Sequence, residues 1–254
     1  VDHENGERMG RDQIDAKTTD QLLEQASTAG LGVDEVIIAA LAVALSASLD
    51  TDRVRMFLEG HGRESDSASV DATRTMGWFT SLYPVLAEVP DSSDMMAVAT
   101  AIRDQIQSVS RSGRDYGVLR YLHPDEDVRS RVALDHQEHV VLNYLGRVAH
   151  AGAAEGDLVL AGPIQLSRPS DANRIFGADV IAYIDNGALT IEWTTHGAAG
   201  ERLQSVVEQL VDQLRAFIVE PAQTPGAFPR AGLDEAGVSK RASILQSTDG
   251  GHSQ

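Results

Sequence analysis

The segment from residue 33 to residue 49 leaves this chain the fewest ways to fold, because its side chains are apolar nearly all round a helix. A helix of that kind is stable where other elements bury it on every side. Its continuous apolar stretch, residues 36–45, is far shorter than the roughly 20 residues that cross a membrane. The segment therefore predicts a helix inside a globular core, and no membrane partner.

Polar signals and helical periodicity predict four more helices. Thr18 and Gln21 have the spacing of a capping box, and Gly30 is a typical stop signal for the helix that Thr18 would begin. Asp91 is a typical N-cap for the helix after it. Apolar residues at helical spacing mark the last helix. The expected helices cover residues 18–29, 92–110, 116–122 and 203–217.

Short alternating or apolar runs predict the strands. The run that begins at residue 76 is expected to end near Pro84, because proline lacks the N–H group that a sheet needs. Asn186 and Gly187 favour the positive φ angles of a type I′ turn, so the runs on either side predict a β-hairpin. Irregular alternation with helices favours an α/β or α+β fold with a mixed sheet. The expected strands are residues 54–58, 140–145, 180–184 and 188–194, together with one that lies within residues 76–86.

Composition and charge exclude several classes of function. The 254 residues contain no cysteine, which removes disulfides, thiol nucleophiles and cysteine-bound metals. The formal net charge of −17 disfavours binding to the phosphates of nucleic acids. Residues 1–17 read as a polar linker, residues 149–178 as an irregular connection and residues 223–254 as a tail or linker. The predicted folded domain is therefore residues 18–222.

The hexapeptide at residues 59–64, Glu-Gly-His-Gly-Arg-Glu, is the first candidate site. Glu59 falls where a predicted strand ends, and the two glycines allow the backbone to approach a ligand closely. A carboxylate that is partly desolvated there can have its pKa raised towards neutrality and act as a base. The alternative is a surface turn in which Arg63 and Glu64 form a solvated pair.

Residues 143–146, Asn-Tyr-Leu-Gly, are the second candidate site. Asn143 and Tyr144 could donate hydrogen bonds to an oxyanion that develops during a reaction. The alternative is a turn asparagine and a half-buried tyrosine. Taken alone, Trp78 and the neighbouring Phe79 are more typical of a core than of a substrate platform, and so is Tyr83.

Other chemical motifs are weak or missing. His136 and His139 are three residues apart and could share a metal ion on a helix, but no third ligand set accompanies them, so no metal site is expected. The nucleophile elbow of α/β hydrolases, the P-loop and the dinucleotide-binding glycine motif are all missing. These absences argue against three large enzyme classes.

In their order, four segments resemble the C-terminal half of an epimerization domain from a nonribosomal peptide synthetase. They are residues 59–64 (EGHGRE), 74–84 (RTMGWFTSLYP), 117–122 (GVLRYL) and 143–146 (NYLG). The resemblance spans about residues 15–220. It implies an α/β lobe similar to chloramphenicol acetyltransferase, with a mixed β-sheet flanked by helices.

The resemblance also implies an activity and its partners. Such domains receive an aminoacyl or peptidyl thioester from a peptidyl carrier protein, on a phosphopantetheine arm, and convert the L form to the D form by removing and returning the α-proton. No cofactor bound to the chain itself is implied, and the expected location is cytoplasmic. Glu59 would be the acid/base, and Asn143 and Tyr144 would line the same site. Candidate substrate-binding residues are His61, Arg63, Trp78 and Thr80.

The chain departs from the family pattern in one respect that matters for catalysis. The family carries a His-His-x-x-x-Asp-Gly motif in an N-terminal lobe, and no His-His pair occurs here. The sequence therefore predicts a lobe that is incomplete without an N-terminal lobe, on the same or a separate chain. Two alternatives stay open: a condensation-type acyltransferase lobe that forms an amide or ester, and a non-catalytic module that docks a carrier protein.

Overall fold

The computed structural model describes the parts of the chain that carry most of the predicted elements. The described residues are 2–3, 7–63, 72, 74–89, 94–108, 113–134, 139–148, 176–195 and 200–219. The chain divides into two units, residues 1–222 and 223–254, and the predicted tail, which is the second unit, lies outside the described residues. Asp91, His136 and residues 149–175 of the predicted connection also lie outside them.

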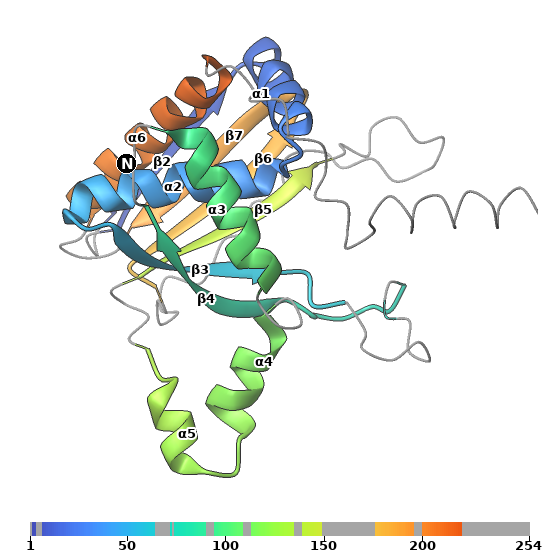
Figure 1. Ribbon diagram of the computed structural model, residues 1–254, viewed down its shortest axis with the longest axis vertical. Helices are drawn as coiled ribbons and strands as arrows, with labels where there is room; N and C mark the ends of the chain where they lie inside the picture. Colours follow the sequence, from blue (N-terminus) through green and yellow to red (C-terminus); the bar gives the residue numbers. More distant parts are fainter. Residues whose placement is uncertain are drawn as a thin grey trace, which may run out of the picture. The chain divides into compact units, whose positions relative to one another are not determined.

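A seven-stranded mixed sheet forms the centre of the first unit (Figure 1). Its strand order is β1-β2-β7-β6-β5-β3-β4. Strand β5 is parallel to both of its neighbours, β3 and β6, and every other pair is antiparallel. The predicted mixed sheet is therefore confirmed. The strands are β1 (Asp2–His3), β2 (Glu7–Ile14), β3 (Arg53–Gly60), β4 (Ser81–Glu88), β5 (Val140–Arg147), β6 (Ala178–Asp185) and β7 (Ala188–Thr195).

Four helices cover one face of this sheet (Figure 1). They are α1 (Ala16–Thr28), α2 (Val33–Leu49), α3 (Met95–Ser108) and α6 (Gly200–Val219). Helix α2 has the predicted bounds, and its residues from Val36 to Leu45 are all buried. Alternate residues of the strands, such as Val54, Met56 and Leu58 of β3, complete this main core.

The opposite face is only partly covered within the described residues. Helix α4 (Arg114–Gly117) lies next to the edge strand β4, and a π-helical turn η2 (Val118–Leu122) and helix α5 (Glu126–Arg131) continue from it away from the sheet (Figure 1). Tyr116 of α4 packs against a small second cluster, which is built on Phe57, Val141 and Phe176. The two faces of the sheet therefore have different roles: one is a core, and the other is partly open.

The predicted linker at residues 1–17 is wrong, because residues Glu7–Ile14 form β2 and pair with β7 along their length. Polar side chains of β2 form hydrogen bonds and an ion pair with side chains of β7. The indole N–H of Trp193 donates to Asp12 at 3.3 Å. A Cβ at Gly10 would lie 2.2 Å from the same indole ring, so only glycine leaves room for that ring.

Two other boundaries differ from the sequence-based expectation. The first helix is capped by Asp15 rather than Thr18: the Asp15 carboxylate accepts from the Thr18 backbone N–H at 3.0 Å and from its hydroxyl at 2.7 Å. Pro84 does not end a strand but lies inside β4. Since β4 is an edge strand, the missing N–H of proline breaks no ladder on its outer side.

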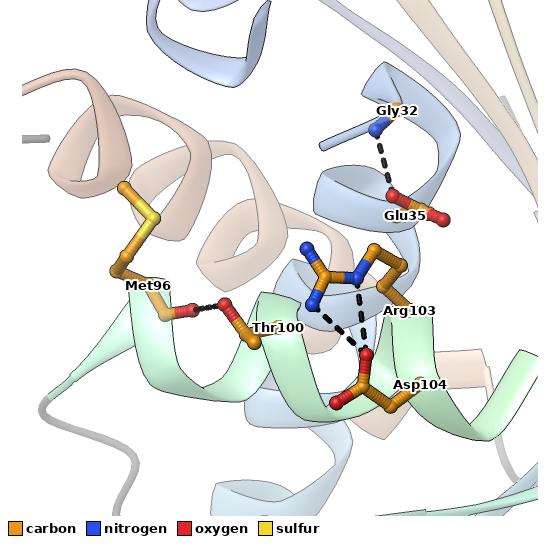
Figure 2. A network of polar contacts seen from close by, with 6 residues as sticks. All are labelled: Gly32, Glu35, Met96, Thr100, Arg103 and Asp104. Carbon is orange, nitrogen blue, oxygen red and sulfur yellow. Dashed lines mark hydrogen bonds and ion pairs between the residues drawn. The ribbon is translucent and has the colours of Figure 1, made fainter. Parts of the chain in front are cut away.

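The hairpin follows the predicted turn chemistry, whereas the cap at the start of α2 is not predicted from the sequence. Asn186 and Gly187 have φ angles of 48° and 85° between β6 and β7, as a type I′ turn requires. At the start of α2, the Glu35 carboxylate accepts from the Gly32 backbone N–H at 2.7 Å. Burial raises the pKa of Glu35. Figure 2 shows this cap beside α3, where the Thr100 hydroxyl donates to the Met96 carbonyl at 2.9 Å.

Among the described residues, no single helix is long and apolar enough to cross a membrane. Helices α1 and α2 reach the required length and apolarity only when taken together, and they are bent by 102° relative to each other. In this fold α2 is the central buried helix.

Candidate active site

Glu59 and Asn143 meet across two adjacent parallel strands. Leu58 of β3 is in register with Leu142 of β5, so the next residue of each strand lies beside its counterpart. The Asn143 side-chain amide donates to the Glu59 carboxylate, with 2.5 Å between Nδ2 and Oε2. Both side chains are half-buried. Two residues that are distant in sequence therefore form one contact, which joins the carboxyl end of β3 to the middle of β5.

This contact lies on the partly open face of the sheet. Side chains two residues apart on a strand share a face. Glu59 therefore shares its face with Phe57, and Asn143 shares its face with Val141; Phe57 and Val141 both belong to the small second cluster. The Phe57 ring also makes edge contacts with Tyr116 and His139. The carboxylate is thus bordered by aromatic and apolar groups on one side.

Tyr144 faces the other way, which corrects its predicted place beside Glu59. It packs against the main core, on the face covered by the helices. Burial raises the pKa of the Tyr144 phenol, and the negative charge of Asp34 on α2 acts in the same direction. The structure therefore joins Asn143 to Glu59 but separates both from Tyr144, as the alternation of side chains along a strand requires.

The turn after Glu59 is closed by contacts with the segment that precedes β4. Gly62 has a φ angle of +60°, and a Cβ there would lie 1.6 Å from the carbonyl oxygen of Phe79. The ring Nδ1 of His61 accepts from the backbone N–H of Arg63 at 3.1 Å. Glycine is therefore required at position 62 for both its φ angle and the close approach of the backbone.

Arg63 connects this turn to the segment at residues 72–79. Its Nη1 donates to the carbonyl oxygens of Ala72 at 2.7 Å and Thr75 at 2.6 Å. Its Nη2 donates to the carbonyl oxygen of Gly77 at 3.4 Å. The guanidinium carbon lies 4.6 Å from the centre of the Phe79 ring. These contacts engage both Nη groups with the protein's own backbone.

Trp78 and Thr80, by contrast, are exposed. Trp78 has 90% of its surface exposed, so the expectation that it belongs to the core is wrong. The expectation for Tyr83 is confirmed, since that side chain is buried in the main core. Contact of a substrate with His61, Arg63, Trp78 or Thr80 stays a prediction.

The chemistry available at this site is that of a carboxylate with an oriented amide donor. A hydrogen bond from Asn143 favours the ionised form of Glu59, and that form can accept a proton. No group of three or more His, Asp or Glu side chains that could hold a metal ion occurs among the described residues. The contact between the Glu59 carboxylate and the Asn143 amide suits proton transfer.

Sequence reasoning missed the acceptors of Arg63. They are backbone carbonyl groups, which every residue has, so no residue type marks them. The position of Tyr144, in contrast, follows from the period of two along a strand that already placed Asn143.

Comparisons with known proteins agree with this fold. Residues 6–227 match the family model described as Condensation domain. The chain is 31% identical, over 237 residues, to one of the proteins that make up the linear gramicidin synthase of Brevibacillus parabrevis. That match covers 89% of this chain and 3% of the relative, so the chain spans a small part of that protein's length.

Several solved structures are similar to the chain, among them two of different kinds. One is the epimerization domain from the third module of tyrocidine synthetase B, with a TM-score of 0.70 and 25% identity, over 84% of this chain and 48% of that one. The other concerns condensation domain-mediated chain release from the enacyloxin polyketide synthase, with a TM-score of 0.58 and 17% identity, over 91% of this chain and 44% of that one. The second likeness concerns the fold alone. The chain spans about half the length of each.

Proposed function

Because the chain belongs to the condensation-domain family, we propose that it is the C-terminal lobe of an epimerization domain of a nonribosomal peptide synthetase. In this role it converts the L-aminoacyl or L-peptidyl thioester on a peptidyl carrier protein to the D form. The phosphopantetheine arm comes with the carrier, and the proposed location is cytoplasmic. The observation that carries the proposal is the contact between Glu59 and Asn143.

Several features support an epimerase within this family. The EGHGRE and RTMGWFT segments of the epimerization branch occur here in order, and Arg63 and Gly62 of the first segment contact the second. A solved epimerization domain is among the similar structures. The chain covers 48% of that structure, which is consistent with one lobe of a two-lobed domain.

The proposed reaction begins at the α-carbon of the thioester. The thioester carbonyl acidifies the α-hydrogen, because the resulting carbanion delocalises into an enolate. The Glu59 carboxylate removes that proton, and the Asn143 amide holds the carboxylate in position. Return of a proton to the opposite face gives the D form. That second proton carrier is assigned to the N-terminal lobe, since this chain has no His-His pair.

A condensation-type acyltransferase is the second candidate, favoured by the likeness in fold to the condensation-domain structure. It would join two carrier-bound substrates through an amide or ester bond. The two functions predict different products from the same loaded carrier: an inverted stereocentre for the epimerase, and a coupled product for the acyltransferase.

The test is exchange of the α-proton in the native protein that contains this chain. A carrier loaded with an aminoacyl thioester is incubated in deuterium oxide, and incorporation at the α-carbon is measured by mass spectrometry. We expect Glu59→Gln to reduce incorporation by about 10²-fold or more, since a general base is lost. Glu88→Gln, at an exposed position on β4, is the matched control and should keep the full rate.

Two results would contradict the proposal. Full deuterium incorporation in Glu59→Gln would remove Glu59 from the reaction. A coupled product from two loaded carriers, without incorporation in the wild-type protein, would favour the acyltransferase.

A further inference from the structure

We propose that Arg63 is a positioning residue, which locks the turn after β3 to the segment at residues 72–79 and thereby fixes the end of β3 that carries Glu59. Its role in catalysis rests on the proposed epimerase function. Its role in holding the two segments does not, so the two can be tested separately.

The first argument is what the Arg63 side chain already binds. The two Nη groups donate to three backbone carbonyl oxygens, those of Ala72, Thr75 and Gly77. One face of the guanidinium lies over the Phe79 ring. A planar guanidinium presents its donors in a rigid fork and can stack on an aromatic ring at the same time, which a lysine ammonium cannot do. A side chain held in this way is suited to fixing a loop.

The second argument is where these contacts lie. Glu59 and Gly60 are the last residues of β3, and Gly60 pairs with Ser81, the first residue of β4. The connection between the two strands therefore spans residues 61–80. Arg63 joins the beginning of this connection to its end, and the contact of Gly62 with the Phe79 carbonyl closes the same gap. Both contacts restrain the strand end next to Glu59.

The third argument concerns what an unrestrained end would do to the site. Strand ends with few buried contacts open locally at low free-energy cost. Glu59 is half-buried, and its carboxylate reaches the Asn143 amide only while the end of β3 keeps its place beside β5. Small displacements of a catalytic group reduce rates strongly. Loss of Arg63 should therefore reduce turnover while leaving substrate affinity nearly unchanged.

Trp78 offers a direct readout of the restraint. It lies between Gly77, whose carbonyl oxygen accepts from Arg63, and Phe79, whose ring lies against the Arg63 guanidinium. The Trp78 side chain itself is exposed. The only other tryptophan is Trp193, which is buried. In a Trp193→Phe background, the fluorescence anisotropy of Trp78 reports how firmly the segment is held, and no substrate is needed.

The experiment compares Arg63→Ala and Arg63→Lys with Arg53→Ala. Arg53 is an exposed arginine at the other end of β3, paired with Glu88 at 3.5 Å. In this 254-residue chain, both Arg63 variants should lower the Trp78 anisotropy, and Arg53→Ala should not. In the native protein that contains the chain, both Arg63 variants should reduce kcat for α-proton exchange by about tenfold or more, with KM within about twofold. Ethylguanidinium added to Arg63→Ala should restore anisotropy and kcat together.

Defined outcomes would overturn the proposal. An unchanged Trp78 anisotropy in both Arg63 variants, with circular dichroism like that of the parent chain, would show that Arg63 does not hold the segment. A raised KM with unchanged kcat would make Arg63 a substrate-binding residue. If the wild-type protein exchanges no α-proton, the proposed function fails, whereas the anisotropy result still decides whether Arg63 fixes the loop.

Discussion

At the residue scale, the side chain of residue 143 that donates to Glu59 is an amide rather than a second acid. The Asn143 Nδ2 donates to the carboxylate and so stabilises the ionised form without adding charge. A carboxylate in the same place would repel Glu59, and the pair would then retain one proton to a higher pH. The identity of residue 143 therefore affects the pH range in which Glu59 can act as a base.

The substitution Asn143→Asp tests this reasoning. We expect the acidic limb of the pH–rate profile for α-proton exchange to move to higher pH, because the two carboxylates share a proton. The measurement is deuterium incorporation as a function of pH, with Asn186→Asp in the distant β6–β7 turn as the control. A profile identical to that of the wild-type protein would contradict the assigned contact.

A second residue-scale prediction concerns Tyr183 on β6. Its hydroxyl donates to the Glu192 carboxylate at 2.8 Å. Burial, followed by this hydrogen bond and the charge of Glu192, raises the pKa of Tyr183 from 10.0 to about 12. The folded state therefore disfavours the tyrosinate form. The stability that Tyr183 contributes is fully present below the pKa of the unfolded chain, and it is lost as the pH rises from 10 to about 12.

The measurement is the free energy of unfolding of the wild-type chain and of Tyr183→Phe across this range. The wild-type chain should lose about 1 kcal/mol more than the variant, a value reduced for the remaining solvent exposure of the pair. Equal losses would mean that Tyr183 titrates as it does in the unfolded chain.

At the element scale, helix α2 has a buried central part and an N-terminal cap whose charged form is disfavoured by burial. Glu35 closes the N-terminus through the Gly32 N–H, but burial raises the pKa of its carboxyl group. The carboxylate is thus disfavoured by the fold, and the stability that Glu35 contributes is lost as the pH rises through its folded-state pKa. Glutamine has an oxygen that can accept the same hydrogen bond without carrying charge.

We therefore expect Glu35→Gln to gain stability over the wild-type chain as the pH rises. Its free energy of unfolding, relative to the wild-type value, should be more favourable near pH 7 than near pH 4. Denaturant unfolding at the two pH values measures this difference. Glu24→Gln, at an exposed position on α1, should show no comparable change, and the same flat response in Glu35→Gln would contradict the prediction.

The elements differ in how well the sequence predicts them. Helix α2 is predicted with its bounds because its apolar run is local, and the β6–β7 hairpin because Asn186 and Gly187 carry the turn chemistry. Strand β2 is missed because its polar residues become a strand only by pairing with β7, which lies far along the chain. Patterns of neighbouring residues predict helices and tight turns, but they carry little information about strands that pair with a distant part of the chain.

The candidate site shows the same division. Glu59 and Asn143 are both named from the sequence, and the structure brings them together. Tyr144 is grouped with them by proximity in sequence, although alternation along β5 places it on the other face. The restraint by Arg63 could not be predicted, since its acceptors are backbone carbonyls whose positions depend on the folded loop.

At the scale of the whole molecule, the sheet has one face covered by four helices and one face that is partly open within the described residues. Glu59 and Asn143 lie on the second. A substrate can therefore reach these two residues without disturbing the packing of the main core.

The antiparallel pairing of β2 with β7 has a consequence for how the chain is made. Asp12 and Trp193 are 181 positions apart and yet share a hydrogen bond. Because β7 is synthesised long after β2, the two strands cannot pair until β7 has left the ribosome. We therefore expect the pairing of β2 with β7 to form late in folding, because contacts between residues far apart in sequence require the closure of a long loop.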